Sequence, residues 1–234
     1  MSTAAFFDLD GTLCSGRIWE GVLKYNPLRK KKRGWIFAFW AKMTPLWFLS
    51  ERRLYSKERC REKWIEHLGG IFKGASTEEV LEVLQWVADN YIFNSLHRDV
   101  IEILEGHKQR RDIVVIVSGT YSGLVEIVGQ RLGVPYVIGT KLEVIDGKYS
   151  GKVVQPLCSG ENKARLLKEF IERNELAIDC SSSFAYADSI FDAPLLKLVG
   201  NPVATYPDRE LRLLAERNGW QTLPRTGDKG IISK

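Results

Sequence analysis

The sequence predicts an α/β protein built on a doubly wound parallel sheet, and two patterns along the chain support this class. Short runs of apolar, β-branched and aromatic residues alternate with longer segments of helical periodicity. The apolar runs are continuous, which is typical of parallel strands that are covered by helices on both faces. A chain of 234 residues is long enough to bury such a core without disulfides.

The strands and helices of this core are predicted as follows. The apolar runs predict buried strands at 4–9, 113–117, 134–138 and 184–187. Helical periodicity predicts helices at 99–107, 121–132, 160–173 and 207–218. Gly133 and Gly219 follow two of these helices directly and suit the left-handed residue that commonly ends a helix.

Two segments interrupt the alternation of strands and helices. Around the pair Asp146-Gly147, two short alternating runs predict a β-hairpin over 141–154. The segment 14–96 contains helical patterns only, and its clearest helix follows a capping box that begins at Ser76. The apolar stripe of that helix consists of Val80, Val83, Leu84, Val87 and Tyr91. We therefore expect a helical domain inserted after the first strand, above the sheet edge where open α/β sheets bind ligands.

Composition and local charge exclude several classes of protein. The four cysteines are scattered without a CxxC pair, which indicates free thiols in a reducing compartment rather than a zinc site or a disulfide framework. The N-terminus lacks a secretory signal, so we expect a cytoplasmic protein. The longest apolar stretch, 34–49, contains Lys42 and Pro45 and is shorter than the roughly 20 residues of a membrane-spanning helix. Net charge is +5, with five cations in the run 29–33, so the basic character is local.

Two aspartates lie where the first strand ends. Asp8 and Asp10 flank Leu9, and the period of two places both carboxylates on one side while Leu9 turns into the core. Two close carboxylates repel each other unless one is protonated or a cation lies between them. An aspartate before a glycine is also common in ordinary turns. The pair nevertheless favours a metal site.

Further polar residues follow the later strands. Ser118 and Gly119 come after the second strand, where a hydroxyl and backbone N–H groups at a helix start suit an anion. Lys163 lies in the first turn of the helix 160–173, which costs about 0.3–1 kcal/mol unless an anionic ligand is present. Asp188 and Asp192 follow the fourth strand. Each residue has an ordinary explanation as a turn, cap or solvated residue, but their shared position at successive strand ends predicts one site.

Through these residues the chain resembles the haloacid dehalogenase superfamily of aspartate-nucleophile phosphatases. The motifs that carry the resemblance are DLDGT at 8–12, Ser118, Lys163, and Asp188 with Asp192. The resemblance implies a Rossmann-like core at 1–13 and 100–234 and an all-helical cap of the C1 type at 14–99. More narrowly, the run FAYADSIFDAPLL is similar to the phosphoserine-phosphatase-like subfamily IB, many of whose members act on other substrates.

The resemblance implies a role for each aspartate. Asp8 would attack phosphorus and form an aspartyl phosphate, and Asp10 would protonate the leaving oxygen and later deprotonate water. A Mg²⁺ ion would be held by Asp8, Asp188 and the main-chain carbonyl of Asp10, and Asp192 would orient water on the metal. An aspartate at position 10 favours phosphomonoester hydrolysis over the dehalogenase and ATPase activities of the superfamily.

The resemblance also implies how the phosphate is held and how the substrate is chosen. Ser118, Gly119 and Lys163 would bind the phosphoryl oxygens. In phosphoserine phosphatases the cap supplies a glutamate and an arginine that grip the amino acid. Arg17 and Glu20 lie in the corresponding neighbourhood, but neither spacing nor sequence aligns Glu20 with that glutamate, so serine phosphate is not singled out. Three loop residues (Thr12, Gly119, Thr120) are expected to shape their loops, and no catalytic role is assigned to the histidines (His67, His97, His107).

The basic run 29–33 and the aromatic residues that follow it allow two interpretations. We favour aromatics that pack the cap and close against the active site, with the basic run as a solvated loop. The alternative is a helix in an anionic membrane surface, or a groove for a lipid-like phosphate. The aromatic residues are Trp35, Phe37, Phe39, Trp40, Trp47 and Phe48. One basic run without a recognition motif does not indicate nucleic-acid binding.

The sequence therefore predicts a Mg²⁺-dependent phosphomonoester hydrolase that acts on a small phosphorylated metabolite through an aspartyl-phosphate intermediate. The alternatives are a phosphotransferase of the same fold, a lysophospholipid-type phosphatase at a membrane surface, and a non-catalytic phosphate-binding or adaptor protein.

Overall fold

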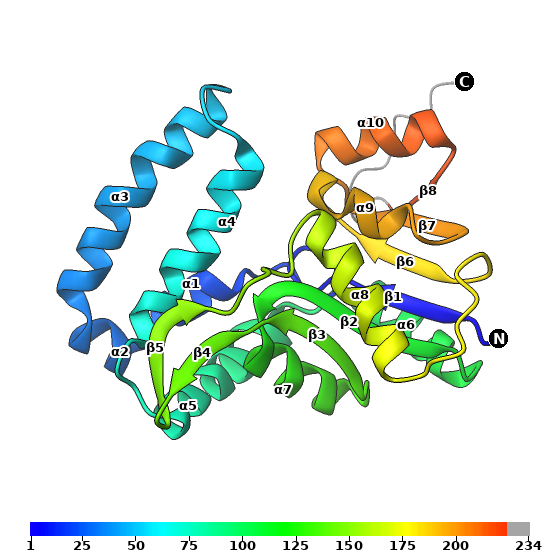
Figure 1. The fold of residues 1–234 in the computed structure, drawn as a ribbon. Helices are drawn as coiled ribbons and strands as arrows, with labels where there is room; N and C mark the ends of the chain where they lie inside the picture. The colour runs from blue at the N-terminus through cyan, green and yellow to red at the C-terminus, as the bar shows by residue number, and fades with distance from the viewer. Residues whose placement is uncertain (224–234) are drawn as a thin grey trace.

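The computed structural model describes residues 1–223, which form a six-stranded parallel sheet with helices on both faces (Figure 1). The strand order is β3-β2-β1-β6-β7-β8, so β1 lies inside the sheet between β2 and β6. The strands are β1 (Ala4–Phe7), β2 (Ile113–Tyr121), β3 (Tyr136–Thr140), β6 (Phe184–Ala187), β7 (Asn201–Thr205) and β8 (Gln221–Leu223). The chain order reverses around β1, which makes its carboxyl end the expected place for a ligand. The predicted fold class is confirmed.

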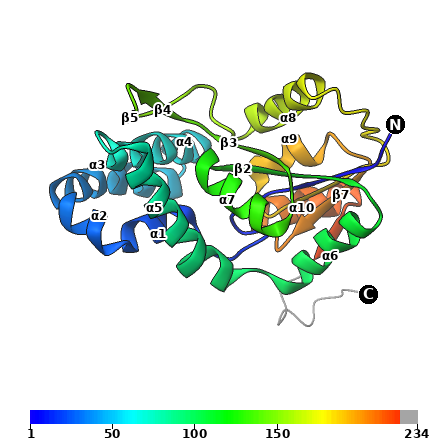
Figure 2. The same cartoon turned by 90° about the horizontal axis from the view of Figure 1, so that it is seen from below.

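The side chains of β1 alternate between two apolar cores, as the period of two requires. Ala5 and Phe7 enter one core, and Ala4 and Phe6 enter the other. On the face of Phe7 lie α6 (Arg98–Gln109) and α7 (Ser122–Leu132), which Figure 2 shows from below. The opposite face is covered by α8 (Glu161–Arg173), α9 (Ala193–Leu196) and α10 (Arg209–Asn218). Every strand residue of β1 is thereby buried, which explains the continuous apolar run.

The sheet differs from the prediction at two places. The strands β7 and β8 were not predicted, because β7 begins with Asn201-Pro202 and β8 is only three residues long. Ser118 and Gly119 were expected at a helix start, and this is wrong: they lie inside β2, which continues to Tyr121. The pairing of β2 with β3 shifts register between Val117 and Tyr121, so an irregularity separates the apolar run from the residues that follow it.

The helices between β1 and α6 form the helical cap. Its helices are α1 (Ile18–Lys24), α2 (Asn26–Lys31), α3 (Arg33–Glu51), α4 (Lys57–Leu68) and α5 (Thr77–Val87). The helices α3 and α4 form an arm that projects from the sheet, with α3 outermost (Figure 1). The predicted capping box of α5 is confirmed, since Ser76 Oγ accepts a hydrogen bond from the N–H of Glu79 and the Glu79 carboxylate accepts one from the N–H of Ser76. Among the described residues, no helix is long and apolar enough to span a membrane.

The basic run 29–33 was expected to be a solvated loop; it is largely exposed, but the expected loop is wrong. It forms the last turn of α2 and the start of α3, with Lys32 between the two helices. Pro27 suits the first turn of α2, and lysine and arginine are good helix formers. The run therefore holds its charges in helical geometry at the base of the arm.

The predicted hairpin is present as β4 (Leu142–Ile145) and β5 (Lys148–Val153). Asp146 and Gly147 both have positive φ, as a two-residue hairpin turn of type I′ requires. Main-chain hydrogen bonds join the hairpin to the cap. The N–H of Gly74 donates to the carbonyl of Tyr149 over 2.8 Å, and the N–H of Tyr149 donates to the carbonyl of Ala75 over 2.9 Å. A core segment thus supports the base of the cap.

Candidate active site

Asp8 stands directly after β1 and is almost fully buried. Its Oδ1 lies 2.5 Å from Nζ of Lys163, and its Oδ2 accepts a 3.4 Å hydrogen bond from Thr12. The main-chain N–H of Asp8 donates to the carbonyl of Tyr186 over 3.0 Å, which ties the residue to β6. The carboxylate is therefore fixed by its backbone and by a cation.

Lys163 lies in the first turn of α8 and is as buried as Asp8. Its Nζ also donates to Oδ1 of Asp192 over 2.7 Å. Burial alone would lower the pKa of this ammonium, but the charges of Asp192 and Asp8 raise it above its usual range. The two carboxylates supply the anionic partners that a lysine at a helix N-terminus otherwise lacks.

Three carboxylates from two strand ends meet at this point. Asp8, Asp188 and Asp192 each place one oxygen within 4.8 Å of the others. Burial raises the pKa of Asp8 to about 6, against the opposing charge of Lys163. Burial, followed by the charges of Asp8 and Asp192, raises the pKa of Asp188 well above its usual range. The site thus holds more negative charge than Lys163 balances.

This donor set fits a hard divalent cation. Oδ2 of Asp192 is buried and has no hydrogen-bond partner, so one oxygen in the cluster is left unsatisfied. Gly11 has φ +96°, and a Cβ at this position would lie 2.2 Å from Oδ2 of Asp188. The glycine is thus required both for its backbone conformation and for the close approach of Asp188. Oxygen-only ligands at this spacing suit Mg²⁺ or Ca²⁺ rather than a soft metal.

Asp10 lies beside this cluster and is held differently. Its carboxylate accepts hydrogen bonds from the hydroxyl of Thr120 and, over 3.2 Å, from the N–H of Ile18. Burial raises its pKa, while these two donors and the charge of Arg61 oppose the rise. Within the described residues, the carboxylate of Asp10 stands outside the three-carboxylate set. Thr120, expected only to shape its loop, contacts this candidate acid.

Ser118 and Gly119 form a rigid segment next to Asp10. The hydroxyl of Ser118 is fully buried and accepts a hydrogen bond from the N–H of Thr120 over 3.1 Å. The carbonyl of Gly119 accepts one from Thr140 over 2.8 Å. A Cβ on Gly119 would lie 3.4 Å from the carbonyl of Cys158 and 3.8 Å from Nη2 of Arg61. This small residue therefore faces the cap.

Arg61 of α4 is the site residue that the sequence analysis missed. Burial alone would lower its pKa, but Asp192, Asp8 and the other nearby aspartates raise it, so the guanidinium stays charged. It also lies over the ring of Phe191, 5.4 Å from the ring centroid. It is one of 34 basic residues, and α4 is rich in charge, so no sequence signal distinguishes it. Only the folding of the cap over the sheet brings it to the aspartates.

The two cap residues considered for substrate recognition, Arg17 and Glu20, have other surroundings than the aspartate cluster. Arg17 is exposed and precedes α1. Glu20 accepts a hydrogen bond from the hydroxyl of Tyr91, within the cap. Nδ1 of His97 lies 2.8 Å from the carbonyl of Thr12. His67 lines a cavity in the arm. His107 belongs to a polar cluster beside β6.

Two cavities flank the arm. The larger, about 520 Å³, lies between α3, α4 and the hairpin, and Trp35, Lys42 and Lys152 are among its lining residues. The other, about 460 Å³, lies between the tip of the arm and the core, and is bordered by Phe191. Phe191 of this second cavity contacts Arg61 and directly precedes Asp192 in the chain. We regard this cavity, rather than the larger one, as the approach to the site, because it is the one that lies beside the charged groups of the site.

Comparisons with known proteins agree with this geometry. A family model described as haloacid dehalogenase-like hydrolase matches residues 5–197. The chain belongs to this family. A phosphoserine phosphatase of Mycobacterium tuberculosis, SerB1, is 27% identical over 94% of this chain and 70% of its own length. This family and its phosphatase relatives identify the chain as a phosphatase.

Solved structures share the fold. A Bordetella pertussis protein of unknown function superposes with a TM-score of 0.76 at 24% identity, over 95% of this chain and 98% of that chain. A phosphoserine phosphatase captured as an analogue of its phospho-aspartyl intermediate has a TM-score of 0.64 at 17% identity, over 95% and 93% of the two chains. These likenesses support the arrangement of sheet and cap.

Proposed function

We propose that this phosphatase hydrolyses small phosphomonoesters by transferring the phosphoryl group to Asp8, with Mg²⁺ as cofactor. The observation that carries the proposal is the convergence of Asp8, Asp188 and Asp192 with the buried ammonium of Lys163. A phosphate monoester resists hydrolysis because anions repel each other and the leaving group is poor. A catalyst must therefore supply a fixed nucleophile, cations and a proton.

The cation would be held by the carboxylates of Asp8 and Asp188 and by the main-chain carbonyl of Asp10. The unpaired Oδ2 of Asp192 supports this assignment, because a buried carboxylate oxygen without a donor is costly unless a cation or a bound water satisfies it. When bound, the cation would neutralise the carboxylates and offset the charge of the transferring phosphoryl group.

The first step is attack of an Asp8 carboxylate oxygen on phosphorus. The bond from Asp8 to phosphorus forms as the bond from phosphorus to the ester oxygen breaks, and Asp10 gives its proton to the leaving oxygen. The raised pKa of Asp10 supports a protonated acid in this role. In the second step water attacks the phosphorus, Asp10 takes the proton, and inorganic phosphate leaves Asp8 free.

The phosphoryl oxygens would be held by groups that surround Asp8. Lys163 reduces the repulsion between Asp8 and an incoming anion. Ser118 and the backbone at Gly119 would contribute hydrogen bonds, and Arg61 would add a guanidinium from the cap. Arg61 thereby makes the phosphate site depend on how the cap lies over the core.

We propose a small phosphorylated metabolite as substrate, since the cap covers the aspartates and the adjoining cavity is about 460 Å³. A cytoplasmic location is proposed on the four free cysteines, of which Cys14, Cys60 and Cys158 are buried thiols.

The nucleophile is tested by trapping the phosphorylated enzyme. With a ³²P-labelled phosphomonoester and an acid quench, the native protein should retain label and Asp8→Asn should retain none. Hydrolysis of p-nitrophenyl phosphate should fall by at least about 10³-fold in Asp8→Asn. Asp179→Asn, at the opposite end of the sheet, is the matched control and should behave as the native protein. Label or near-native turnover in Asp8→Asn would refute the assignment.

The cofactor is tested by binding as well as by turnover. Chelation with EDTA should stop hydrolysis, and Mg²⁺ should restore it. Because a ligand that binds only the folded state stabilises it, Mg²⁺ should also raise the melting temperature of the native protein and not that of Asp188→Asn. Full activity after exhaustive chelation, or equal stabilisation of both proteins, would remove the metal from the proposal.

A further inference from the structure

The outermost helix of the arm, α3, is apolar around its whole circumference, although only one side of it is covered. It has 19 residues and, between its ends, a single charged side chain, Lys42. Phe39 and Met43 are buried against the rest of the cap, and Trp40 packs edge-on against the rings of Trp19 and Trp64. A helix that is hydrophobic all round normally lies in a protein core or in a membrane.

The opposite side of α3 carries an exposed apolar face. Phe37 is 77% exposed, Trp47 52% and Phe48 49%, and Trp40, which packs on Trp19 and Trp64 at the margin of this face, is still 38% exposed. Positions 37, 40, 47 and 48 fall on one side of a helix, because they are separated by three, seven and one residues. In Figure 1 this helix lies at the edge of the molecule, with α4 between it and the core. The expected packing of the aromatics therefore accounts for the inner side of α3 and leaves the outer side uncovered.

Basic residues border this apolar face at both ends. The run 29–33 lies at the N-terminal end of α3, and Arg52 and Arg53 follow its C-terminal end. Eight of the 34 basic residues and one of the 29 acidic residues lie in segment 29–53, so this segment carries +7 and the remaining chain −2. The basic character of the protein is concentrated on the element that exposes aromatic residues.

We propose that the outer face of α3 docks on the surface of an anionic lipid bilayer. The helix would lie in the plane of the interface, with Phe37, Trp47 and Phe48 at the boundary of the acyl chains and the basic ends on the headgroups. Tryptophan and phenylalanine suit this depth, and each lysine or arginine near an anionic surface adds to the attraction. The inference goes beyond the phosphatase activity and does not depend on it.

Charge argues against a second copy of the chain as the occupant. Both ends of α3 are basic, so parallel and antiparallel pairing of two such helices would each place cations against cations. An anionic surface is complementary to both ends at once. The docked arm would also bring the bilayer close to the mouth of the site, because Arg53 and Leu54 at the arm tip border the cavity beside Phe191.

The test is co-sedimentation of the full-length protein with vesicles of phosphatidylcholine alone and of phosphatidylcholine mixed with phosphatidylglycerol. We expect binding to the anionic vesicles at low salt, loss of binding at high salt, and little binding to the neutral vesicles. The triple variant Phe37→Ser/Trp47→Ser/Phe48→Ser should bind at least about tenfold more weakly. Leu81→Ser/Leu213→Ser, which removes similarly exposed apolar residues elsewhere, should bind like the native protein.

The charge contribution is tested separately. Arg29→Glu/Lys30→Glu should weaken binding to anionic vesicles, whereas Lys168→Glu/Lys197→Glu, at exposed positions outside the arm, should not. Melting temperature and p-nitrophenyl phosphate hydrolysis in solution should be unchanged in all four variants. Absence of binding at low salt, equal binding of the triple variant, or a dimer in light scattering that the triple variant alone abolishes would overturn the proposal.

Discussion

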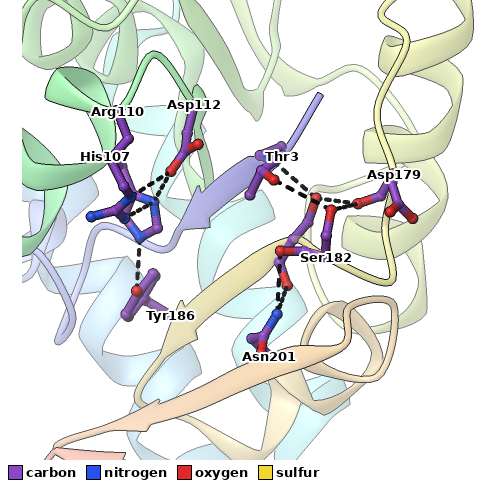
Figure 3. A network of polar contacts seen from close by, with 10 residues as sticks. Thr3, His107, Arg110, Asp112, Asp179, Ser182, Tyr186 and Asn201 are labelled. Carbon is purple, nitrogen blue, oxygen red and sulfur yellow. Dashed lines mark hydrogen bonds and ion pairs between the residues drawn. The ribbon is translucent and has the colours of Figure 1, made fainter. Parts of the chain in front are cut away.

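The two ends of the parallel sheet use polar side chains in opposite ways. At the amino ends, hydroxyl and amide groups hold the chain together: the hydroxyls of Thr3 and Ser182 lie 3.3 Å apart, and Asn201 donates to the carbonyl of Ser182 over 3.2 Å (Figure 3). At the carboxyl ends, Asp8 and Asp188 belong to a cluster of three carboxylates and have raised pKa values, and one ammonium, that of Lys163, contacts Asp8 and Asp192. At the amino ends, neutral groups satisfy one another by hydrogen bonds. At the carboxyl ends, part of the negative charge has no counterion.

This difference separates a structural role from a functional one. A network of neutral groups contributes to stability because each of its members has a partner. Crowded carboxylates cost stability in the absence of a counterion, so folding alone does not account for them. Substitutions at the carboxyl ends should therefore affect turnover first, and substitutions at the amino ends should affect stability alone.

Lys163→Met should have the largest effect. The change removes the cation beside Asp8 and Asp192 and leaves both carboxylates buried without it, at a cost of about 3–5 kcal/mol in unfolding free energy. Hydrolysis should fall by at least about 10³-fold, because the cation in direct contact with Asp8 no longer reduces the repulsion between Asp8 and substrate. Lys168→Met, an exposed lysine of the same helix, is the control. Urea unfolding and steady-state kinetics measure both effects; a stable, active variant would contradict the electrostatic account.

Gly11→Ala should disable the site while the rest of the sheet stays folded. The new Cβ would lie 2.2 Å from Oδ2 of Asp188, so this carboxylate must move. We expect a loss of turnover of about 10²-fold or more, together with weaker stabilisation by Mg²⁺. Gly74→Ala is a matched control, because Gly74 also has positive φ but nothing lies within 4 Å of its Cβ position. If both variants lose only the same small amount of stability, the contact with Asp188 is unimportant.

Much of the site follows from local sequence because parallel strands end at one edge. Asp8 and Asp188 each follow an apolar run, and the parallel sheet brings these runs together. The missed elements have weak local signals. β8 is three residues long and only partly buried, and its pairing with β7 depends on the chain between them forming α10. Whether residues 221–223 form a strand therefore depends on their pairing with β7 rather than on their composition.

Arg61 could not be predicted for a different reason. Its position depends on the path of the whole cap, and the exposed lysines and arginines of α4 have the same local pattern. The aromatic residues of the arm show the same limit: sequence identified the cluster, but the sorting of Phe39 to the inside and Phe37 to the outside depends on which side of α3 meets α4. Long-range packing therefore decides both the position of the second cationic side chain of the site, Arg61, and the exposed face of the arm.

Arg61→Ala should reduce kcat/KM for p-nitrophenyl phosphate by about 10²-fold, with a rise in KM, because a charged donor beside the phosphoryl group is lost. Arg61→Lys should recover part of the loss, since it keeps the charge without the planar fork. Arg59→Ala, an exposed arginine of the same helix, should have native kinetics. Unchanged KM and kcat in Arg61→Ala would show that the guanidinium does not meet the substrate.

Ser183→Ala tests the amino ends of the strands. Its fully buried hydroxyl accepts a 2.9 Å hydrogen bond from the N–H of Ala4 and donates over 2.6 Å to the carbonyl of Asp179. The variant removes this partner of the Ala4 N–H and leaves the carbonyl of Asp179 with only the 3.2 Å hydrogen bond from Ser182. The loss should cost about 1–3 kcal/mol and lower the melting temperature by several degrees. The exposed Ser181 provides the control as Ser181→Ala. Kinetic constants should be unchanged in both variants, and a fall in kcat for Ser183→Ala would mean that the two ends are coupled.

The smallest expected effect concerns pH and the polar cluster between the two ends (Figure 3). Nε2 of His107 lies 2.8 Å from the hydroxyl of Tyr186, and Nδ1 lies 2.7 Å from the carboxylate of Asp112. Burial, helped by the charge of Arg110, lowers the pKa of His107 below 6.5, although Asp112 opposes this. Below pH 6.5 the unfolded chain therefore binds more protons at this position than the folded protein does. The stability contributed by neutral His107 is complete above that pH and is lost as the pH falls.

Between pH 7.5 and pH 5.5 the melting temperature of His107→Gln should accordingly fall less than that of the native protein, because glutamine has no proton to take up. Comparing the two pH slopes isolates His107 from the aspartates, which titrate in both proteins. The two proteins should have the same turnover at pH 7.5, since His107 contacts the hydroxyl of Tyr186 within β6 and not the end of that strand, where Asp188 lies. Identical slopes would show that His107 is protonated equally in the folded and unfolded states, which would mean that Asp112 outweighs burial.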